Sequence, residues 1–344
     1  MMLFRRALDS DLDAIHHLAK LSGIGMTTLP KDKKLLEKRI KWSTASYHKD
    51  INEPDSEYYF FVLENQCTKE IIGISGIESR IGFATPFYSY KLTRRTRVSR
   101  TLKIRNEYEV LSLVNDKQGH SELCTLFLNP AHRRNNNGIL LSKGRFLFMA
   151  QHPQRFAPII IADMRGVSDK NGNSPFWNNI GSHFFKMTFA KADQLTLATN
   201  KQFIADLMPR NPIYVKLLSP EAQAVIGQPH PLTIPAYNTL LREGFRYHQY
   251  IDIFDGGPTL ETPVEKIKTV ELSKLVIISS LSDEVSSAKY LLSNAQLNFR
   301  ATIDTALVNT ERNTCIISKK TAQVLSVDCG DTLRLAPLEI TQSV

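Results

Sequence analysis

The junction HSELCTLFLNPAHRRNNNGILLSKGRFLFM, residues 120–149, constrains the fold of this chain more than any other stretch. An apolar run ends at Asn129 and Pro130, a short polar loop follows, and a second apolar run starts after Gly138. This order predicts a strand, a tight loop and the first turn of a helix. Backbone N–H groups converge at such a junction, where the helix dipole also favours an anion. The loop therefore predicts a phosphate site between a sheet and a helix.

The strand before this loop is apolar on nearly both faces, which is typical of a central strand covered by helices on each side. A second buried strand is predicted at residues 157–166. Ahead of the junction, residues 3–77 carry the patterns of a strand, two helices and a hairpin. Together these elements indicate an α+β fold, with a central sheet flanked by helices.

The length of 344 residues is enough for about two domains. Beyond about residue 270 the pattern changes to short strand candidates such as KLVIISS and TLRLAPLEI. We therefore expect a main domain over residues 1–270 and a small, separate β-rich C-terminal subdomain over residues 271–344. Within the main domain, residues 174–189 and 234–254 share one order, in which a helix, a glycine break and a strand follow each other.

The net charge of +9 favours polyanionic partners in general. Seven positive charges fall in KLTRRTRVSRTLKIR, residues 91–105. This segment contains no aromatic residue on which a base could stack, so a solvated strand or loop edge is favoured over a nucleic-acid surface. A small polyanionic ligand would be attracted by the same field.

The cysteine and hydropathy patterns exclude several classes of protein. The four cysteines are far apart and form no C-x-x-C pair, so neither a disulfide framework nor a metal site is expected. No apolar run approaches the roughly 18 residues of a membrane span, and the N-terminus lacks the apolar core of a signal peptide. Reduced thiols and these absences favour a cytoplasmic protein without a membrane or nucleic-acid partner.

Two sets of ionisable residues are candidates for chemistry. Asp163 and Arg165 share one face at the end of a buried strand, where they form either an internal ion pair or part of a substrate site. Among the nine histidines, His120 and His183 lie at the ends of predicted elements. His230 lies between two prolines that restrict its backbone, and it either shuttles a proton or caps the next helix.

Several longer strings closely resemble the arginine N-succinyltransferase family of the GNAT acyltransferase superfamily: SELCTLFLNP, MRGVSDKNGNSPFW, GSHFFKMTFAKAD, FIADLMPRNPIY, EAQAVIGQPHP and EGFRYHQYIDIFDGGPTLE. The resemblance runs from about residue 3 to 270 and continues more loosely to VLSVDCGDTLRLAPL. It departs in residues 272–318, in the more basic 91–105 segment, and at Asn136, which replaces the first glycine of the superfamily's pyrophosphate loop. Asparagine tolerates left-handed backbone angles better than most residues, so the loop can keep its shape.

The resemblance implies a GNAT-like mixed central sheet and a defined reaction. Succinyl-CoA, a co-substrate rather than a permanently bound cofactor, and L-arginine would give N2-succinyl-L-arginine and coenzyme A. This is the first step of arginine catabolism by the succinyltransferase pathway. The family also makes a multimer expected, formed with further copies of the chain or with a paralogous subunit.

Residue roles carry over from the resemblance position by position. His230, in the HP dipeptide of its segment, is implied as the proton donor. The coenzyme A contacts implied on the strand and in the loop are Leu126, Leu128, Arg133, Arg134, Asn136 and Gly138.

The charged ends of both substrates also need partners. A carboxylate suits the guanidinium group of arginine, and Glu122, Asp163 and Asp255 are the candidates. Arg165 is the first candidate for the succinyl carboxylate. Three other functions stay open at this point: an acyltransferase acting on a related amine such as ornithine, a non-catalytic subunit that binds acyl-CoA, and nucleic-acid binding on the strength of charge alone.

Overall fold

A computed structural model describes residues 1–23, 25–26, 28–83, 85–198 and 202–338. Within these residues, fifteen strands form one continuous mixed sheet in the order β12-β15-β11-β14-β13-β1-β2-β3-β6-β7-β10-β9-β4-β5-β8. The strands are β1 Met2–Arg6, β2 Tyr58–Asn65, β3 Ile71–Glu78, β4 Ser89–Ser99, β5 Ile104–Val114, β6 Ser121–Leu128, β7 Ile159–Asp163, β8 Ile213–Tyr214, β9 Arg246–Ile251, β10 Pro258–Pro263, β11 Lys274–Ser282, β12 Lys289–Asn294, β13 Arg300–Asn309, β14 Thr314–Ser318 and β15 Thr332–Pro337.

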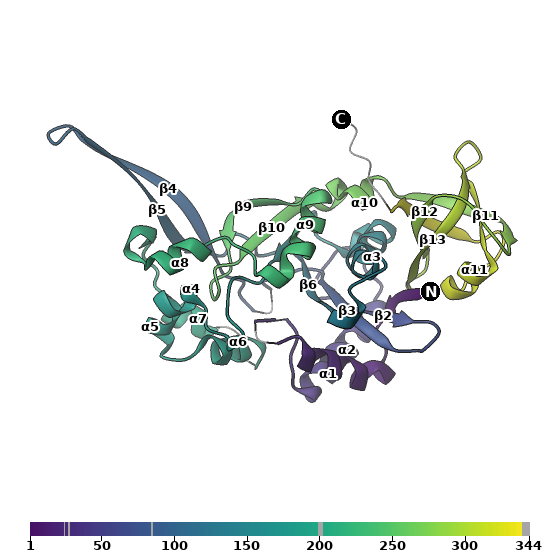
Figure 1. Ribbon diagram of the computed structural model, residues 1–344, viewed down its shortest axis with the longest axis horizontal. Coiled ribbons are helices and arrows are strands. Elements are labelled where there is room, and N and C mark those ends of the chain that lie inside the picture. The colour runs from purple at the N-terminus through teal and green to yellow at the C-terminus, as the bar shows by residue number, and fades with distance from the viewer. Residues whose placement is uncertain (24, 27, 84, 199–201, 339–344) are drawn as a thin grey trace.

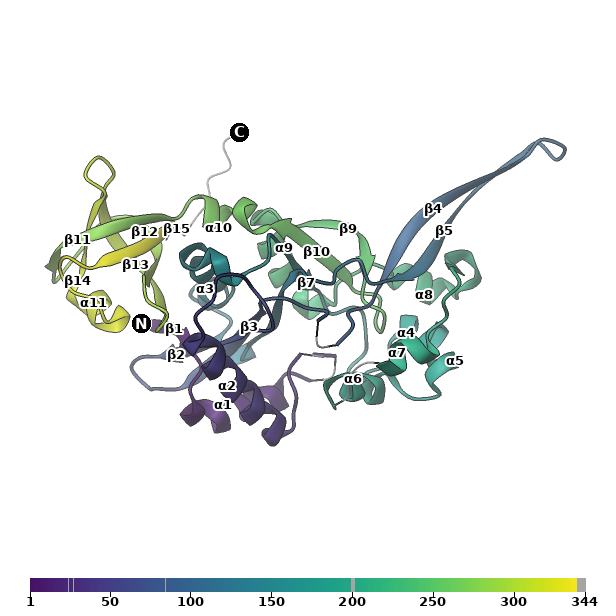
Figure 2. The same ribbon diagram turned by 180° about the vertical axis from the view of Figure 1, so that it is seen from behind.

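Helices cover both faces of this sheet, as the sequence predicts (Figures 1 and 2). They are α1 Leu12–Leu21, α2 Lys33–His48, α3 Asn137–Gln151, α4 Pro175–Asn179, α5 Gly181–Phe185, α6 Phe189–Ala198, α7 Gln202–Leu207, α8 Pro220–Val225, α9 Ile234–Arg242, α10 Lys268–Glu271 and α11 Lys319–Leu325. None of them is both long and apolar enough to cross a membrane, within the ranges described above.

The alternation of strand β2 explains why helices cover both faces. Tyr59, Phe61 and Leu63 pack into the cluster that contains the apolar residues of α3. Their neighbours Tyr58, Phe60 and Val62 point the other way, into the cluster formed with α1 and α2. Successive side chains of a strand point to opposite faces, so a strand that is apolar at every position must be covered twice.

The basic segment lies on a long two-stranded arm formed by β4 and β5. The two strands pair along their whole length, from Ser89 opposite Val114 to Ser99 opposite Ile104. Figures 1 and 2 show that the arm projects away from the rest of the chain. Residues 94–98 at its outer half are exposed, so the prediction of a solvated strand edge is confirmed.

One expected strand is absent. The sequence order predicts a strand at the end of residues 174–189, but the structure places α5 there, followed by α6 from Phe189. The equivalent order in residues 234–254 is confirmed, because α9 leads into β9. A short apolar run can form either element, and the partner decides. Phe185 packs its ring 5.5 Å from that of Trp177, on a neighbouring helix rather than a strand.

The C-terminal strands build a cluster of their own but also join the rest of the chain. Residues of β11 to β15 and α11 form one apolar cluster. Strand β13 pairs with β1, through Phe4 opposite Ala301 and Arg5 opposite Arg300. Phe299, at the start of β13, is fully buried and packs its ring 6.2 Å from that of Phe4 and 5.2 Å from that of Phe148 on α3.

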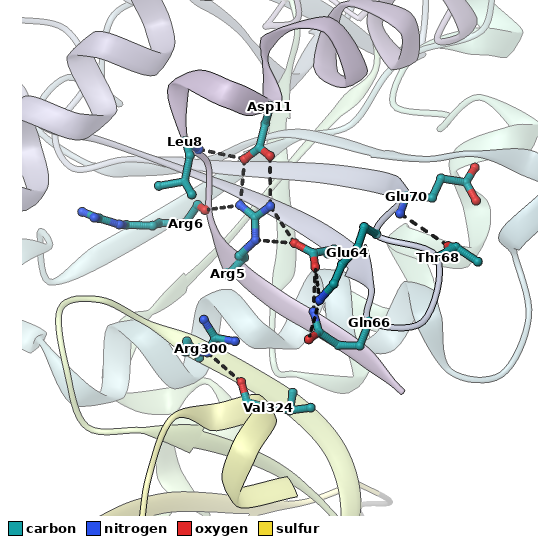
Figure 3. Close-up of polar contacts among 11 residues, drawn as sticks. Arg5, Arg6, Leu8, Asp11, Glu64, Gln66, Thr68, Glu70, Arg300 and Val324 are labelled. Carbon is teal, nitrogen blue, oxygen red and sulfur yellow. Dashed lines mark hydrogen bonds and ion pairs between the residues drawn. The ribbon is translucent and has the colours of Figure 1, made fainter. Parts of the chain in front are cut away.

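Polar contacts hold the first strand at this junction (Figure 3). The guanidinium group of Arg5 donates hydrogen bonds of 2.7 and 2.9 Å to the carboxylate of Asp11 and one of 2.7 Å to Glu64. Arg300, its cross-strand neighbour, donates to the backbone oxygen of Val324. Burial and the charge of Arg5 lower the pKa of Arg300. The division of the chain at residue 270 stays a prediction, which the following substitution tests.

Replacing Phe299 with Ala should lower the free energy of unfolding of residues 1–270 as well as of the tail, by about 3–5 kcal/mol. The physical reason is the cavity left among aromatic rings of β1, β2 and α3. Both tryptophans of the chain, Trp42 and Trp177, lie before residue 270, so the urea midpoint of their fluorescence reports on that part alone.

The matched control is Leu307→Ala on the same strand, because Leu307 is 52% exposed. It should change stability by less than about 0.5 kcal/mol. A tryptophan midpoint that stays unchanged in Phe299→Ala would mean that residues 271–344 unfold independently.

Candidate active site

The loop after β6 has the geometry that the sequence predicts. The side-chain oxygen of Asn129 accepts a hydrogen bond of 3.1 Å from the backbone of Ala131 and ends the strand. Asn135 and Asn136 then adopt left-handed backbone angles, with φ of 53° and 61°. Helix α3 begins at the next residue, Asn137. Asn136 therefore has the left-handed backbone conformation that the sequence predicts for it.

The surface above this loop is open. A side chain at Gly138 would meet only Leu128, at 3.8 Å, so packing within the described chain does not require a glycine there. Arg133 and Arg134 are exposed, and Arg133 also donates from Nε to the backbone oxygen of Leu128. Free space, two cations and the first turn of a fifteen-residue helix together suit a phosphate group.

Strand β6 pairs with its parallel neighbour, β7, only at its start. Among the described residues, β6 pairs with β7 only through Ser121 and Glu122, although it continues to Leu128. Thr125, with φ of 57°, marks an irregularity where the register with β3 also shifts. Leu126 follows it and is half-buried. The second half of β6 therefore has a backbone edge that β7 does not pair, on which the N–H of Thr125 donates instead to the hydroxyl of Thr28.

His230 lies at the start of a short turn and is only 9% exposed. Its backbone N–H donates a hydrogen bond of 2.7 Å to the oxygen of Arg165, and its Nδ1 accepts one of 3.1 Å from the backbone N–H of Leu232. It therefore caps the turn, as one of the two interpretations expects. Because Nδ1 accepts this bond, the proton of the neutral imidazole is on Nε2, which is the nitrogen that can donate one.

The surroundings of His230 lower its pKa. Burial is the larger cause, and the charge of Arg165 adds to it, while a hydrogen bond to the backbone of Ser168 opposes both. Burial raises the pKa of the carboxyl group of Asp255 as well. The imidazole is therefore neutral near pH 7.

The structure brings Arg165 and Asp255 to the segment of His230. Asp255 accepts hydrogen bonds of 2.7 Å from the backbone of Gly166 and 2.9 Å from that of Gly257. Arg165 donates from Nη2 to the hydroxyl of Ser168 at 3.1 Å. Asp255 thus joins two turns through backbone groups.

The other candidates lie elsewhere on the sheet or surface. Asp163 ends β7 and accepts a hydrogen bond from the hydroxyl of Thr259 on β10. Glu122 is buried within β6. His120 contacts the backbone oxygen of Lys117, and His183 is exposed on α5. Across the described residues, no three His, Cys, Asp or Glu side chains form a group that could hold a metal ion.

A cavity of about 570 Å³ borders the segment that precedes His230, because Gln228 and Pro229 form part of its wall. Side chains from distant places in the sequence complete it, among them Glu109 on β5, Tyr237 on α9 and Tyr247 on β9. Sequence reasoning missed these residues, because no local pattern links positions so far apart.

Family models match nearly the whole chain. The model described as "Arginine N-succinyltransferase beta subunit" matches residues 2–269. The model described as the C-terminal domain of that subunit matches residues 273–337.

Individual relatives agree with these matches. The chain is 43% identical to an arginine N-succinyltransferase of Enterobacter sp. (strain 638) over 341 residues, and 40% identical to the arginine N-succinyltransferase subunit beta of Pseudomonas aeruginosa over 337 residues, each alignment covering 98% of both chains. The solved structure of arginine/ornithine succinyltransferase subunit AI from Pseudomonas aeruginosa superimposes with a TM-score of 0.90. It is 36% identical and covers 99% of both chains.

Gly138→Asp should weaken the binding of succinyl-CoA about 100-fold or more, because a carboxylate would face a diphosphate within a few ångströms. Calorimetry measures the affinity. Gly138→Asn adds nearly the same volume without the charge and should weaken binding less. Neither variant should unfold the chain, since a side chain at this position meets only Leu128. Equal affinity in the wild type and Gly138→Asp would place the phosphate somewhere else.

Proposed function

Because the chain belongs to the arginine N-succinyltransferase family, we propose that it transfers the succinyl group of succinyl-CoA to the α-amine of L-arginine. The observation that carries this proposal is the match of sequence and fold over essentially the full length, with a TM-score of 0.90 to the subunit from Pseudomonas aeruginosa. The products would be N2-succinyl-L-arginine and coenzyme A.

Succinyl-CoA would extend from the loop along β6 in a GNAT-like arrangement. Arg133, Arg134 and the first N–H groups of α3 would hold the diphosphate. The amides of the pantetheine arm would pair with the edge of β6 that β7 leaves unpaired, near Leu126 and Leu128, as an added strand does. The thioester would then lie toward the middle of the sheet, where β6 and β7 part. A backbone N–H of the same edge would stabilise the oxyanion that forms on the thioester carbonyl.

The chemical step needs one proton to move from nitrogen to sulfur. The neutral amine attacks the thioester carbonyl, the C–N bond forms, and the C–S bond breaks to release a thiolate. His230 would be the proton donor: it would give the proton on Nε2 to that thiolate and recover through water the proton that the nitrogen gives up. Its lowered pKa means that it starts this step as a neutral imidazole.

The nearby charged residues would have distinct roles in this proposal. Arg165 remains the candidate partner of the succinyl carboxylate, since its charge acts directly on His230. Asp255 would be a positioning residue, because both of its oxygens accept backbone hydrogen bonds. Asp163 accepts from Thr259 and would orient the end of β7. A cytoplasmic location and assembly into a multimer stay predictions.

The names of the relatives favour two variations on this function. Both relatives from Pseudomonas aeruginosa are named as subunits, and one of them is named as an arginine/ornithine succinyltransferase. A second copy or a paralogous subunit would then complete the active assembly, and ornithine would be a second amine substrate. Purified chain incubated with succinyl-CoA and a panel of amino acids, with thiol release followed over time, separates these cases. Release with no amine of the panel would contradict the proposal for the chain alone.

His230→Ala should lower kcat by about 10²–10⁴-fold, the usual contribution of a general acid or base, and change the KM of both substrates little. His230→Asn is the sharper variant, because its amide oxygen can still accept from the backbone of Leu232 but cannot carry a proton. A variant that keeps more than about a third of kcat, far above that range, would move the role to His120 or His183.

The pH dependence of kcat gives an independent measurement. Because burial and Arg165 disfavour the imidazolium, the pKa of His230 lies below its ordinary value near 6.5. Below that value Nδ1 becomes protonated and loses the bond from Leu232 that holds the ring, so activity should fall there. This acid limb should disappear in His230→Asn. A limb centred above pH 6.5 would mean that another group controls the rate.

A further inference from the structure

The cavity that borders the segment before His230 has an acidic lining. Of the described residues that line it, Glu109 alone carries a charge at neutral pH. The remaining polar lining consists of amides and tyrosines, among them Gln228, Tyr237 and Gln249. A cavity with one carboxylate and no lysine or arginine in its wall favours a cationic occupant. The charge of this cavity is opposite to that of the loop before α3, where Arg133 and Arg134 favour an anion.

A buried hydroxyl group points to the same conclusion. The hydroxyl oxygen of Tyr247, in the wall of the cavity, is buried and forms no hydrogen bond with the described residues. Buried polar atoms nearly always have a partner, so this one fits a ligand that brings a donor. Burial, with Glu109 next in importance, raises the pKa of Tyr247 to about 12, and the hydroxyl therefore stays neutral.

Two backbone features, at Gly227 and Gln249, affect the space around the Tyr247 hydroxyl group. A side chain at Gly227 would come within 2.7 Å of the Tyr247 hydroxyl oxygen, so the absence of one keeps the site open. Gln249 adopts a φ of 65°, which is strained for a residue other than glycine. The pairing of β9 with β10 is irregular at the same place. Such irregularities redirect side chains and are common beside functional sites.

The wall of the cavity and the histidine belong to one short anchored segment. Gly227 donates a hydrogen bond of 2.8 Å to the backbone of Gly256, and Pro229 forms a bridge with Gly166. His230 follows and donates to Arg165. A substrate whose amine lies at His230 could therefore extend a side chain along Gln228 and Pro229 into the cavity.

Glu109 is better suited to a substrate cation than the two aspartates considered first. Asp255 already accepts two backbone hydrogen bonds, and Asp163 accepts one from Thr259. Within the described residues, Glu109 forms an ion pair with Nη2 of Arg94 at 3.9 Å, a distance that is too long for a hydrogen bond. The Arg94 side chain is 70% exposed, so this surface contact is weak and replaceable.

We propose that this cavity holds the cationic side chain of the amine substrate, with Glu109 as its carboxylate partner and Tyr247 as a hydrogen-bond acceptor. The proposal rests on the proposed function and specifies its second substrate site. A guanidinium group carries five N–H donors in one plane, and it also stacks on tyrosine rings, so it fits this lining in both respects.

The test compares Glu109→Gln with the wild type on three amines: L-arginine, L-ornithine and L-citrulline, the last being neutral and of nearly the same shape as arginine. Glu109→Gln should raise the KM for L-arginine by about 10–100-fold, the range of a hydrogen bond to a charged group. The KM for succinyl-CoA should stay unchanged. The wild-type preference for arginine over citrulline should fall by a similar factor.

Two further variants separate binding from structure. Glu107→Gln removes the same charge two residues away on β5, outside the cavity, and should leave all constants unchanged. Tyr247→Phe removes only the hydroxyl, which has no partner among the described residues, so it should not lower the unfolding midpoint. It should nevertheless raise the KM for L-arginine by about 2–10-fold.

Each outcome decides between the two proposals. An active wild type whose KM for L-arginine is the same in Glu109→Gln would overturn the cavity assignment and leave the proposed function intact. A wild type that transfers succinyl to none of the amines would overturn both. A KM for succinyl-CoA that rises together with that for arginine would also reject the assignment, since Glu109 would then support the whole site.

Discussion

A buried carboxyl group, Asp255, joins the segments on which the active site depends. It accepts from Gly166 after β7 and from Gly257 before β10, and Pro229 and His230 attach to the first of these turns. A side chain on Gly257 would collide with the backbone oxygen of Met164, so close approach is possible only because glycine is present. Burial raises the pKa of Asp255, an electrostatic cost that its two backbone hydrogen bonds offset in part. The position of the histidine follows from this contact.

Charge is distributed along the site in the order that the two substrates require. At one end, Arg133 and Arg134 lie at the N-terminus of α3, where an anion is favoured. At the other end, the cavity wall carries Glu109 as its charged group among the described residues. Between them, a histidine of lowered pKa is neutral at physiological pH. A polyanionic thioester and a cationic amine would therefore approach from opposite directions and meet at His230, the proposed proton donor.

The sheet that supports this arrangement continues through the N-terminal strand into the tail. Strand β1 lies between β2 and β13, so the first residues of the chain connect its two halves. On this strand, Arg5 donates hydrogen bonds to Asp11 and Glu64. Its neighbour Phe4 packs against Phe299, which immediately precedes β13. Helix α3 carries the phosphate loop and also contacts Phe299 through Phe148. The tail thus supports the helix whose first turn would bind the coenzyme.

The sequence alone determined the features that depend on neighbouring residues. The strand, the loop with left-handed Asn136 and the start of α3 all follow from local backbone preferences, and the doubly apolar β2 required helices on both faces. Tertiary structure decided the rest, because distant contacts set it. Residues 181–185 became a helix through packing on Trp177. Burial and the charge of Arg165 lower the pKa of His230, and both come from contacts that no local pattern shows. Glu109 and Tyr247 line one cavity although they lie 138 positions apart in the chain, and no local pattern encodes such a meeting.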